Sequence, residues 1–289
     1  MTISPSADLR ARVAHLFVHP VKSCAGVALS EVRLMDTGLD LDRAWMVVDD
    51  TGCFVTQREL PRMALIAPQI KATEVVLRAP GMLALHLDVD RVETPTRATV
   101  WRDEVPAWDM GHVAAQWLSD FLGRPGLRLV RFDPDTQRLA DQKWTGDVAA
   151  PVEFVDGFPL LVVSQASLDE LNAKLQAAGH AAVDMARFRP NIVLDGLQAQ
   201  DEDRLAELRI ATIEGAVVLR PCKPCSRCPI PNIDPATGQS SPEVLDTLST
   251  YRANATLNGA ITFGMNAVIV NGQGHMLRVG DAVTADWRF

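Results

Sequence analysis

The stretch AWMVVDDTGCFV, residues 44–55, decides how the first part of this chain folds. An apolar run, Ala44–Val48, is followed by the turn-forming residues Asp49–Gly52 and then by a second apolar segment, Phe54–Val55. Two apolar runs separated by Asp and Gly residues predict an antiparallel β-hairpin. Similar short β-rich segments and turns alternate over about Val13–Leu87, which predicts a β-meander or a small barrel.

One helix is predicted after this β-rich region. Over Gly111–Leu122 the apolar side chains recur every fourth residue, at Val113, Trp117 and Phe121, and Gly123 follows as a stop signal. This spacing is typical of an amphipathic helix. We expect the helix to cover one end of the sheet.

A domain junction is predicted in the middle of the chain. The predicted strand Leu127–Phe132 is followed by a polar stretch, residues 133–151, that contains several Pro and Gly residues. Such stretches are typical of the connection between folded units. We therefore expect a mainly β (α+β) fold with two intimately packed β-barrel-like domains, residues 10–132 and 152–289, and a few helices.

The second half is again predicted to be mostly β. Ser167–Glu170 has the form of a capping box, which predicts a helix that ends near Gly179. The other predicted elements are strands Pro159–Val163 and Ile192–Leu194, hairpin turns at Glu214–Gly215 and Asn271–Gly272, and a helix over Leu245–Tyr251.

The composition is that of an ordinary globular protein, with 47% hydrophobic and 22% charged residues. The formal net charge of −8 argues against general nucleic-acid binding, because no surplus of Lys and Arg is available to neutralise phosphates. The longest convincing apolar run, Leu160–Val163, is too short to span a membrane, and Met1–Arg12 contains no apolar secretory core. We therefore expect a soluble, cytoplasmic protein that binds anions only through a local cluster of cations.

Three of the five cysteines crowd into the segment RPCKPCSRCP, residues 220–229, at two-residue spacing. The three prolines of this segment exclude a helix interior, so it is predicted to be a stiff loop that can aim a sulfur. Lys223 and Arg227 lie beside the thiols and favour the thiolate, the form that binds metals. The spacing is poor disulfide geometry and fits a reducing compartment.

Several kinds of site are open for these cysteines. The spacing matches the first three ligands of an iron–sulfur cluster, but Asn232 stands where a fourth cysteine is needed. A structural zinc ion would need four ligands, and no histidine lies near the segment in sequence. A buried, unreactive thiol is the better interpretation for Cys222 and for Cys53, whereas the role of Cys225 stays open.

Short motifs follow one another in a specific order along nearly the whole chain. By these motifs the chain resembles the two-part MOSC proteins, in which an N-terminal β-barrel domain precedes a MOSC domain, and it is similar to relatives of the mitochondrial amidoxime-reducing component. The resemblance implies that residues 10–132 and 152–289 are these two domains. The motifs are Phe17–Cys24 with Gly26, Asp42–Trp45, Thr56–Arg58 with Pro61–Arg62, Arg187–Ile192, Cys225–Cys228, Ile233–Gly238, Thr250–Arg252, Phe263–Gly264 and Val279–Asp281.

The resemblance implies a molybdenum cofactor whose metal is held by the pterin dithiolene and by one protein thiolate. That thiolate is the second cysteine of Cys-x-Arg-Cys, here Cys228, and a soft sulfur ligand suits such a centre. Arginine side chains can grip a phosphate through two bonds, whereas a lysine offers a point charge. The cofactor-binding positions implied by the motifs are Lys22, Ser23, Arg43, Arg189, Asn191, Ser226 and Arg227. Ser23 and Asn191 could equally satisfy local backbone groups.

The activity implied by the resemblance is the reduction of N-hydroxylated or N-oxide compounds, with Cys228 as the catalytic metal ligand. Some bacterial relatives carry a fused ferredoxin domain that this sequence does not show, so electrons are expected from a separate ferredoxin-type protein or flavin reductase. The alternative is a carrier of the molybdenum cofactor or of sulfur, in which Cys228 is a reactive thiol that holds a persulfide.

Other conspicuous side chains are interpreted as structural. His15 and His19 flank a β-segment, so we expect them to be solvated or packed instead of binding a metal together. The tryptophans at positions 45, 101, 108 and 117 are expected to pack in the core or at a barrel end, because no basic stripe accompanies them. In the stretch Asp156–Pro159 animal relatives have small hydroxyl residues before the proline, so any cofactor contact there is expected to be through the backbone.

Overall fold

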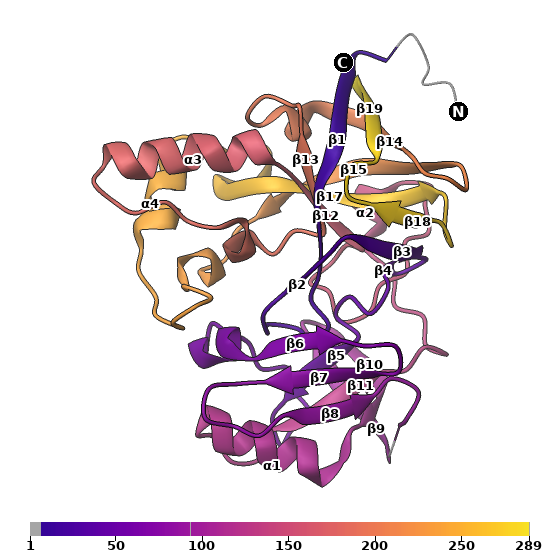
Figure 1. Ribbon diagram of the computed structural model, residues 1–289, viewed down its shortest axis with the longest axis vertical. Helices are drawn as coiled ribbons and strands as arrows, with labels where there is room; N and C mark the ends of the chain where they lie inside the picture. Colours follow the sequence, from indigo (N-terminus) through magenta and orange to yellow (C-terminus); the bar gives the residue numbers. More distant parts are fainter. Residues whose placement is uncertain (1–6, 93, 289) are drawn as a thin grey trace.

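The computed structural model describes residues 7–92 and 94–288. Part of the N-terminal segment for which no secretory core was expected, residues 1–6, lies outside this range. Strands dominate the described chain, and helices are few (Figure 1). The predicted mainly β fold is therefore confirmed.

A closed seven-stranded barrel forms the larger part of the molecule. All neighbouring strands are antiparallel except one parallel pair, β12 with β13, and β17 pairs back with β12 to close the barrel. Closure leaves none of these seven strands with a free edge around the ring. In order around the barrel they are β12 (Leu160–Ser164), β13 (Ile192–Asp195), β1 (Leu9–Val18), β19 (Ala282–Trp287), β14 (Leu205–Ala211), β15 (Ala216–Ser226) and β17 (Ala260–Asn271). Two short strands extend it, β2 (Val27–Leu29) beside β1 and β16 (Ala253–Asn254) beside β17.

The barrel interior is filled by branched apolar side chains. In β14, for example, Leu205, Leu208 and Ile210 are almost fully buried and belong to one continuous core with residues of the other barrel strands. Val, Ile and Leu pack well on a pleated surface, and their burial is the main contribution to the stability of such a barrel.

Strands β5 to β11 lie at the other end of the molecule (Figure 1). One four-stranded sheet has the order β5, β11, β10, β9, and a three-stranded sheet has the order β6, β7, β8. A second hydrophobic core lies between these sheets and α1. The bounds are β5 (Trp45–Val48), β6 (Ala67–Ile70), β7 (Glu74–Arg78), β8 (Leu85–Asp88), β9 (Thr94–Val100), β10 (Asp103–Asp109), α1 (Gly111–Leu122) and β11 (Arg128–Phe132).

Strand β1 crosses from the beginning of the chain into the barrel built by the second half. It pairs with β13 on one side and β19 on the other, and β3 (Glu31–Met35) pairs with β4 (Gly38–Leu39) and with β18 (Met276–Arg278). The strands of residues 10–132 therefore do not all belong to one sheet system. This interleaving packs the two parts of the chain against each other.

The predicted helices are present in the structure, but one predicted cap and one pair of helix bounds differ from it. Helix α1 has its predicted bounds and ends on Gly123, whose positive φ of 67° suits glycine. The predicted capping box is wrong. Helix α3 (Gln165–Ala177) begins before Ser167, whose hydroxyl instead donates to the buried carboxylate of Glu202. The predicted helix over Leu245–Tyr251 is α4 (Glu243–Ser249), shifted by two residues.

Two other expectations about connections are tested by the strand pairing. The turn at Glu214–Gly215 joins the paired strands β14 and β15, as predicted. The turn at Asn271–Gly272 does not form a hairpin, because β17 pairs with β15 and β18 pairs with β3. The short helical elements are η1 (Pro61–Leu65), α2 (Gln142–Thr145), η2 (Met185–Phe188), η3 (Asp201–Arg204), η4 (Ile230–Asn232) and η5 (Ala255–Leu257). Within residues 7–92 and 94–288, no helix has the length and apolar character needed to cross a bilayer.

Candidate functional site

All eight residues that the sequence singled out line one cavity. The cavity has a volume of about 120 Å³ and is formed by loops from both halves of the chain. Residues 22–23 and 43 come from the first half, and residues 188–191 and 225–230 come from the second half. The eight are Lys22, Ser23, Arg43, Arg189, Asn191, Ser226, Arg227 and Cys228. The fold thus brings together groups that are more than 200 residues apart in sequence.

Three of these residues have backbone conformations that are unusual for residues with a side chain. Ser23, Arg43 and Arg189 have φ values of 65°, 56° and 56°. Non-glycine residues with positive φ are uncommon, and each such conformation costs about 1–3 kcal/mol. Such residues gather at functional sites, where the surrounding structure holds them in place.

Cations dominate the cavity lining. Five positively charged side chains line it, against the single carboxylate of Asp156. In a protein of net charge −8 this is a strong local concentration of positive charge. The five are Lys22, Arg43, Arg58, Arg189 and Arg227. The arrangement favours binding of an anion.

Lys22 and Asp156 form an ion pair at one side of the cavity. The Lys22 Nζ donates to Asp156 Oδ1 at 2.5 Å and to the Phe154 carbonyl at 2.7 Å. Burial of the ammonium lowers the pKa of Lys22, although Asp156 works against that shift. Desolvation opposes the charge of Asp156, but the Lys22 ammonium outweighs it and holds the pKa of that carboxyl well below its usual range. The Asp156 side chain is thus the counter-ion of a predicted site residue, a role that the sequence did not suggest.

Asp42 holds the second group of cations from behind the cavity wall. Its carboxylate is buried and accepts hydrogen bonds from the His19 backbone N–H at 2.7 Å, from Asn191 Nδ2 at 2.9 Å and from Arg43 Nη1. Burial alone would raise the pKa of Asp42, but the Arg43 guanidinium and these donors lower it to about 2. Asp42 is a positioning residue that sequence reasoning did not select.

Two guanidinium groups are crowded together beside Asp42. Arg43 Nη2 donates to the Arg189 carbonyl at 3.0 Å, and Arg189 Nη1 donates to the Cys24 carbonyl. Burial, and then repulsion by Arg43, lowers the pKa of Arg189 to about 10. An anion bound between these two arginines would relieve their repulsion.

Asn191 and His19 both have structural roles beside Asp42. Both ends of the Asn191 amide are engaged, because its Oδ1 accepts from the Leu161 N–H at 3.0 Å and its Nδ2 donates to Asp42. His19 is buried, and burial lowers its pKa well below the usual value, so it is a neutral packed residue as expected.

The three clustered cysteines do not converge. Residues 220–226 of the segment expected to be a loop belong to strand β15, whereas residues 227–229 lie beyond its end. The pairing of β15 with β17 shifts register at Pro221/Lys223 and at Pro224/Ser226. Prolines are tolerated in sheets at such bulges, which also re-aim the neighbouring side chains. Cys225 and Cys228 line the cavity, whereas the Cys222 thiol donates to the Asn266 carbonyl and does not line it.

The surroundings of the thiols differ accordingly. Burial raises the pKa of the Cys222 thiol to about 11, which fits an unreactive packed side chain. Arg227 Nη1 donates to Cys225 Sγ at 3.0 Å, and its Nη2 donates to the Phe188 carbonyl at 2.7 Å. Lys223 lies over the rings of Trp144 and Phe158, and its charge also acts on the Cys222 thiol, where it opposes the rise of the pKa caused by burial. Over the described part of the chain, no group of three His, Cys, Asp or Glu residues could hold a metal ion, which disfavours the cluster and zinc interpretations.

Residues near the cavity mouth were missed or misjudged from the sequence. Arg58 lines the cavity and was part of a quoted motif, but it was not selected as a site residue. Trp45 and Trp117 are buried as expected, whereas the Trp101 side chain is 46% exposed and does not pack in a core. The local signal at Trp101 is its position in a tight turn between two strands, which places it at a surface tip.

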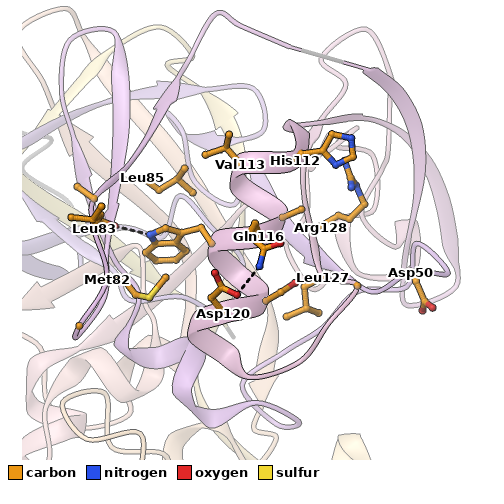
Figure 2. Close-up of a pocket in the computed structure, with 16 residues that line it drawn as sticks. Asp50, Met82, Leu83, Leu85, His112, Val113, Gln116, Asp120, Leu127 and Arg128 are labelled. Atoms are coloured by element: carbon orange, nitrogen blue, oxygen red, sulfur yellow. Dashed lines mark hydrogen bonds between the residues drawn. The ribbon is translucent and has the colours of Figure 1, made fainter.

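A larger groove lies over α1, away from these residues. It has a volume of about 1090 Å³, and Trp117 is among its lining residues. The exposed side chains of Leu83 and Val113 also line it (Figure 2). The Trp117 Nε1 donates to the Leu83 carbonyl, which ties α1 to the opposite wall of the groove. The groove contains neither thiols nor a concentration of cations. We therefore base the candidate site on the smaller, cationic cavity.

Comparison with known proteins gives matches over both halves of the chain. Residues 10–125 match the MOSC N-terminal beta barrel domain, and residues 149–284 match the MOSC domain. The mitochondrial amidoxime-reducing component 1 of Homo sapiens is 35% identical over 253 residues, which are 83% of this chain and 72% of that protein. A molybdenum cofactor sulfurase of Bos taurus is 31% identical over 266 residues, 86% of this chain but 30% of that protein.

Among solved structures, the YUAD protein from Bacillus subtilis aligns with 97% of this chain and 98% of its own at 12% identity, with a TM-score of 0.41. The first of the relatives above is mitochondrial by name. The cytoplasmic location expected for this chain stays a prediction.

Proposed function

Because this chain belongs to the family of MOSC-domain proteins that includes the mitochondrial amidoxime-reducing components, we propose that it is a molybdenum-cofactor-dependent reductase of N-hydroxylated or N-oxide compounds. The observation that carries the proposal is the single cavity in which a cysteine, Cys228, lies among five cations. The names of the relatives link the family to amidoxime reduction and to the molybdenum cofactor. Independently of these names, the thiol and the cations of the cavity support binding of an anionic cofactor with a soft metal.

The residues present fit such a cofactor by their chemistry. An anionic, phosphate-bearing ligand would neutralise the excess of positive charge and separate the crowded guanidiniums of Arg43 and Arg189. Arg227 Nε is buried with no hydrogen-bond partner among the described residues, so a donor is available within the cavity wall. Cys228 offers the soft ligand that such a metal centre prefers.

Each group has a distinct task in the proposed enzyme. Cys228 is the protein ligand of the metal, while Lys22, Arg43 and Arg189 hold the anionic and polar parts of the cofactor, together with Ser23, Asn191, Ser226 and Arg227. When bound, the cofactor supplies the redox chemistry that removes oxygen from the substrate nitrogen. The protein orients it, keeps one side of the cavity accessible to a small substrate and stabilises the negative charge. A separate redox protein, of ferredoxin or flavin reductase type, supplies the electrons.

Arg227 and Asp42 prepare this arrangement. Arg227 ties the segment Cys225–Cys228 to the Phe188 carbonyl, and Asp42 fixes the Arg43 side chain. The site is thus held in place by hydrogen bonds within the protein before any ligand binds, which reduces the cost of ordering it on binding.

The proposal is tested by a reductase assay. The protein is produced with molybdate in a host that makes the cofactor, and N-hydroxybenzamidine is offered with a chemically reduced viologen as the electron source. We expect formation of benzamidine that depends on enzyme concentration and on molybdenum content. Protein that contains molybdenum but gives no benzamidine, and whose Cys228 thiol is alkylated readily, would instead identify a carrier of the cofactor or of sulfur.

A further inference from the structure

Arg58 is an arginine held at the cavity without a carboxylate partner. Its Nε donates to the Thr56 hydroxyl at 3.2 Å, and its guanidinium carbon lies 4.8 Å from the centre of the Trp101 ring and 5.9 Å from that of Phe54. Within residues 7–92 and 94–288, no acidic side chain lies within ion-pair distance of Arg58 and no acceptor engages its two terminal nitrogens. A fixed guanidinium with free terminal N–H groups is prepared for a bidentate oxyanion.

The aromatic surface beneath Arg58 is itself fixed in place. The Trp101 indole N–H donates to Asp156 Oδ1 at 3.1 Å, and the Phe54 and Trp101 ring centres are 5.1 Å apart. The Phe54 backbone N–H donates to the Thr99 carbonyl, which ties that ring to β9. Trp101 adopts a positive φ of 58°, uncommon for a large residue, at the turn between β9 and β10. This backbone conformation is energetically unfavourable, and it places a half-exposed indole beside the cavity.

We propose that Arg58, Trp101 and Phe54 form a substrate subsite at the cavity, which takes a planar, conjugated group carrying a carboxylate. The carboxylate is bound by the free edge of the Arg58 guanidinium, and the conjugated plane lies against the aromatic pair. This inference rests on the proposed function, which requires an N-oxygenated group at one end of the substrate. The subsite adds that the substrate also carries a conjugated ring with a carboxylate. Asp156 already neutralises Lys22, so within this part of the lining Arg58 is the cation left for an incoming anion.

A phosphate of the bound cofactor could supply the same oxyanion chemistry, so the experiment must distinguish the two sources. Wild type, Arg58→Gln and Arg62→Gln are compared for kcat/KM with N-hydroxybenzamidine and with its 4-carboxy derivative. Arg62 is a matched control, because its guanidinium also stacks on an aromatic ring, that of Phe121 at 4.7 Å, but does not line the cavity. Molybdenum content is measured on each preparation.

The expected result is a change of selectivity. In wild type kcat/KM is higher for the carboxylated compound, and Arg58→Gln lowers the ratio of the two kcat/KM values about 10-fold to 100-fold, the effect of a charge-assisted hydrogen-bonded pair. Arg62→Gln keeps the wild-type ratio. If Arg58→Gln loses molybdenum in proportion to activity with an unchanged ratio, Arg58 holds the cofactor and the inference is wrong. An unchanged ratio with unchanged molybdenum also overturns it.

A binding measurement separates this inference from the proposed function. Calorimetric titration of the same proteins with benzoate needs no turnover, and we expect Arg58→Gln and Trp101→Leu to weaken benzoate binding while Arg62→Gln does not. If benzoate binding depends on Arg58 but the protein has no reductase activity, the subsite is supported and the proposed function is contradicted. If the protein has reductase activity but benzoate binding is the same in wild type and Arg58→Gln, the proposed function is supported and the subsite is contradicted.

Discussion

Replacing Asp42 by asparagine is expected to lower the free energy of unfolding by about 3 kcal/mol, because a buried guanidinium and a buried amide then lose their charged acceptor. The carboxylate accepts from Arg43, from Asn191 and from the His19 backbone. An asparagine amide would turn an N–H group toward at least one of these donors. Urea unfolding of the cofactor-free chain at pH 7 measures the loss.

The pH dependence of the stability difference between wild type and Asp42→Asn provides a second test. The pKa of Asp42 is about 2 in the folded protein and 3.8 in the unfolded chain, so its contribution is fully present above about pH 4 and is lost as the pH falls towards 2. The difference between wild type and variant should therefore be constant from pH 7 to about pH 5 and shrink below pH 4. Asp195→Asn removes an exposed partner of Arg12 and should change stability far less. Equal effects of the two substitutions would contradict the role given to Asp42.

Replacing Cys228 by serine is expected to lower reductase activity by about 100-fold or more, since loss of an outer-shell partner of a metal already costs 10-fold to 100-fold. Serine is close to cysteine in size but is a harder, less acidic ligand. Cys228 is half-buried at the cavity, so the thermal unfolding temperature of the cofactor-free chain should change little. The kcat of both proteins with N-hydroxybenzamidine and reduced viologen measures the effect.

Cys222→Ser is the matched control for this substitution. Cys222 belongs to the same cysteine segment, but its thiol donates to the Asn266 carbonyl and does not line the cavity. Activity per molybdenum should stay near that of wild type in this variant. A Cys228→Ser protein that retains most of its activity would show that the metal has no protein sulfur ligand there.

Patterns that depend on neighbouring residues could be predicted from the sequence. Helix α1 follows from the spacing of Trp117 and Phe121 and from Gly123, and the mainly β character follows from short apolar runs between turns. The site residues could be selected only because whole motifs matched a family. Spacing along the chain gives no indication that Lys22 and Cys228 share one cavity.

Features decided by distant partners could not be predicted. Strand β1 lies in the barrel of the second half because β13 and β19 offer it edges, which no local pattern reveals. The capping box at Ser167 failed because the buried Glu202 competes for the hydroxyl. The cysteine segment was predicted as a loop from its prolines, but bulges against β17 accommodate Pro221 and Pro224 in a strand. Asp156 and Arg58 acquire their roles only from the neighbours that the fold gives them.

The most direct test of the central claim is elemental analysis for molybdenum, iron and zinc. Wild type, Cys228→Ser and Cys222→Ser are produced side by side with molybdate in a cofactor-competent host. The account predicts near-stoichiometric molybdenum in wild type and in Cys222→Ser, and a marked loss in Cys228→Ser. The account is contradicted if wild type contains iron or zinc but no molybdenum, and if both Cys228→Ser and Cys222→Ser lose that metal. The cysteine segment would then be an iron–sulfur cluster site or a structural zinc site.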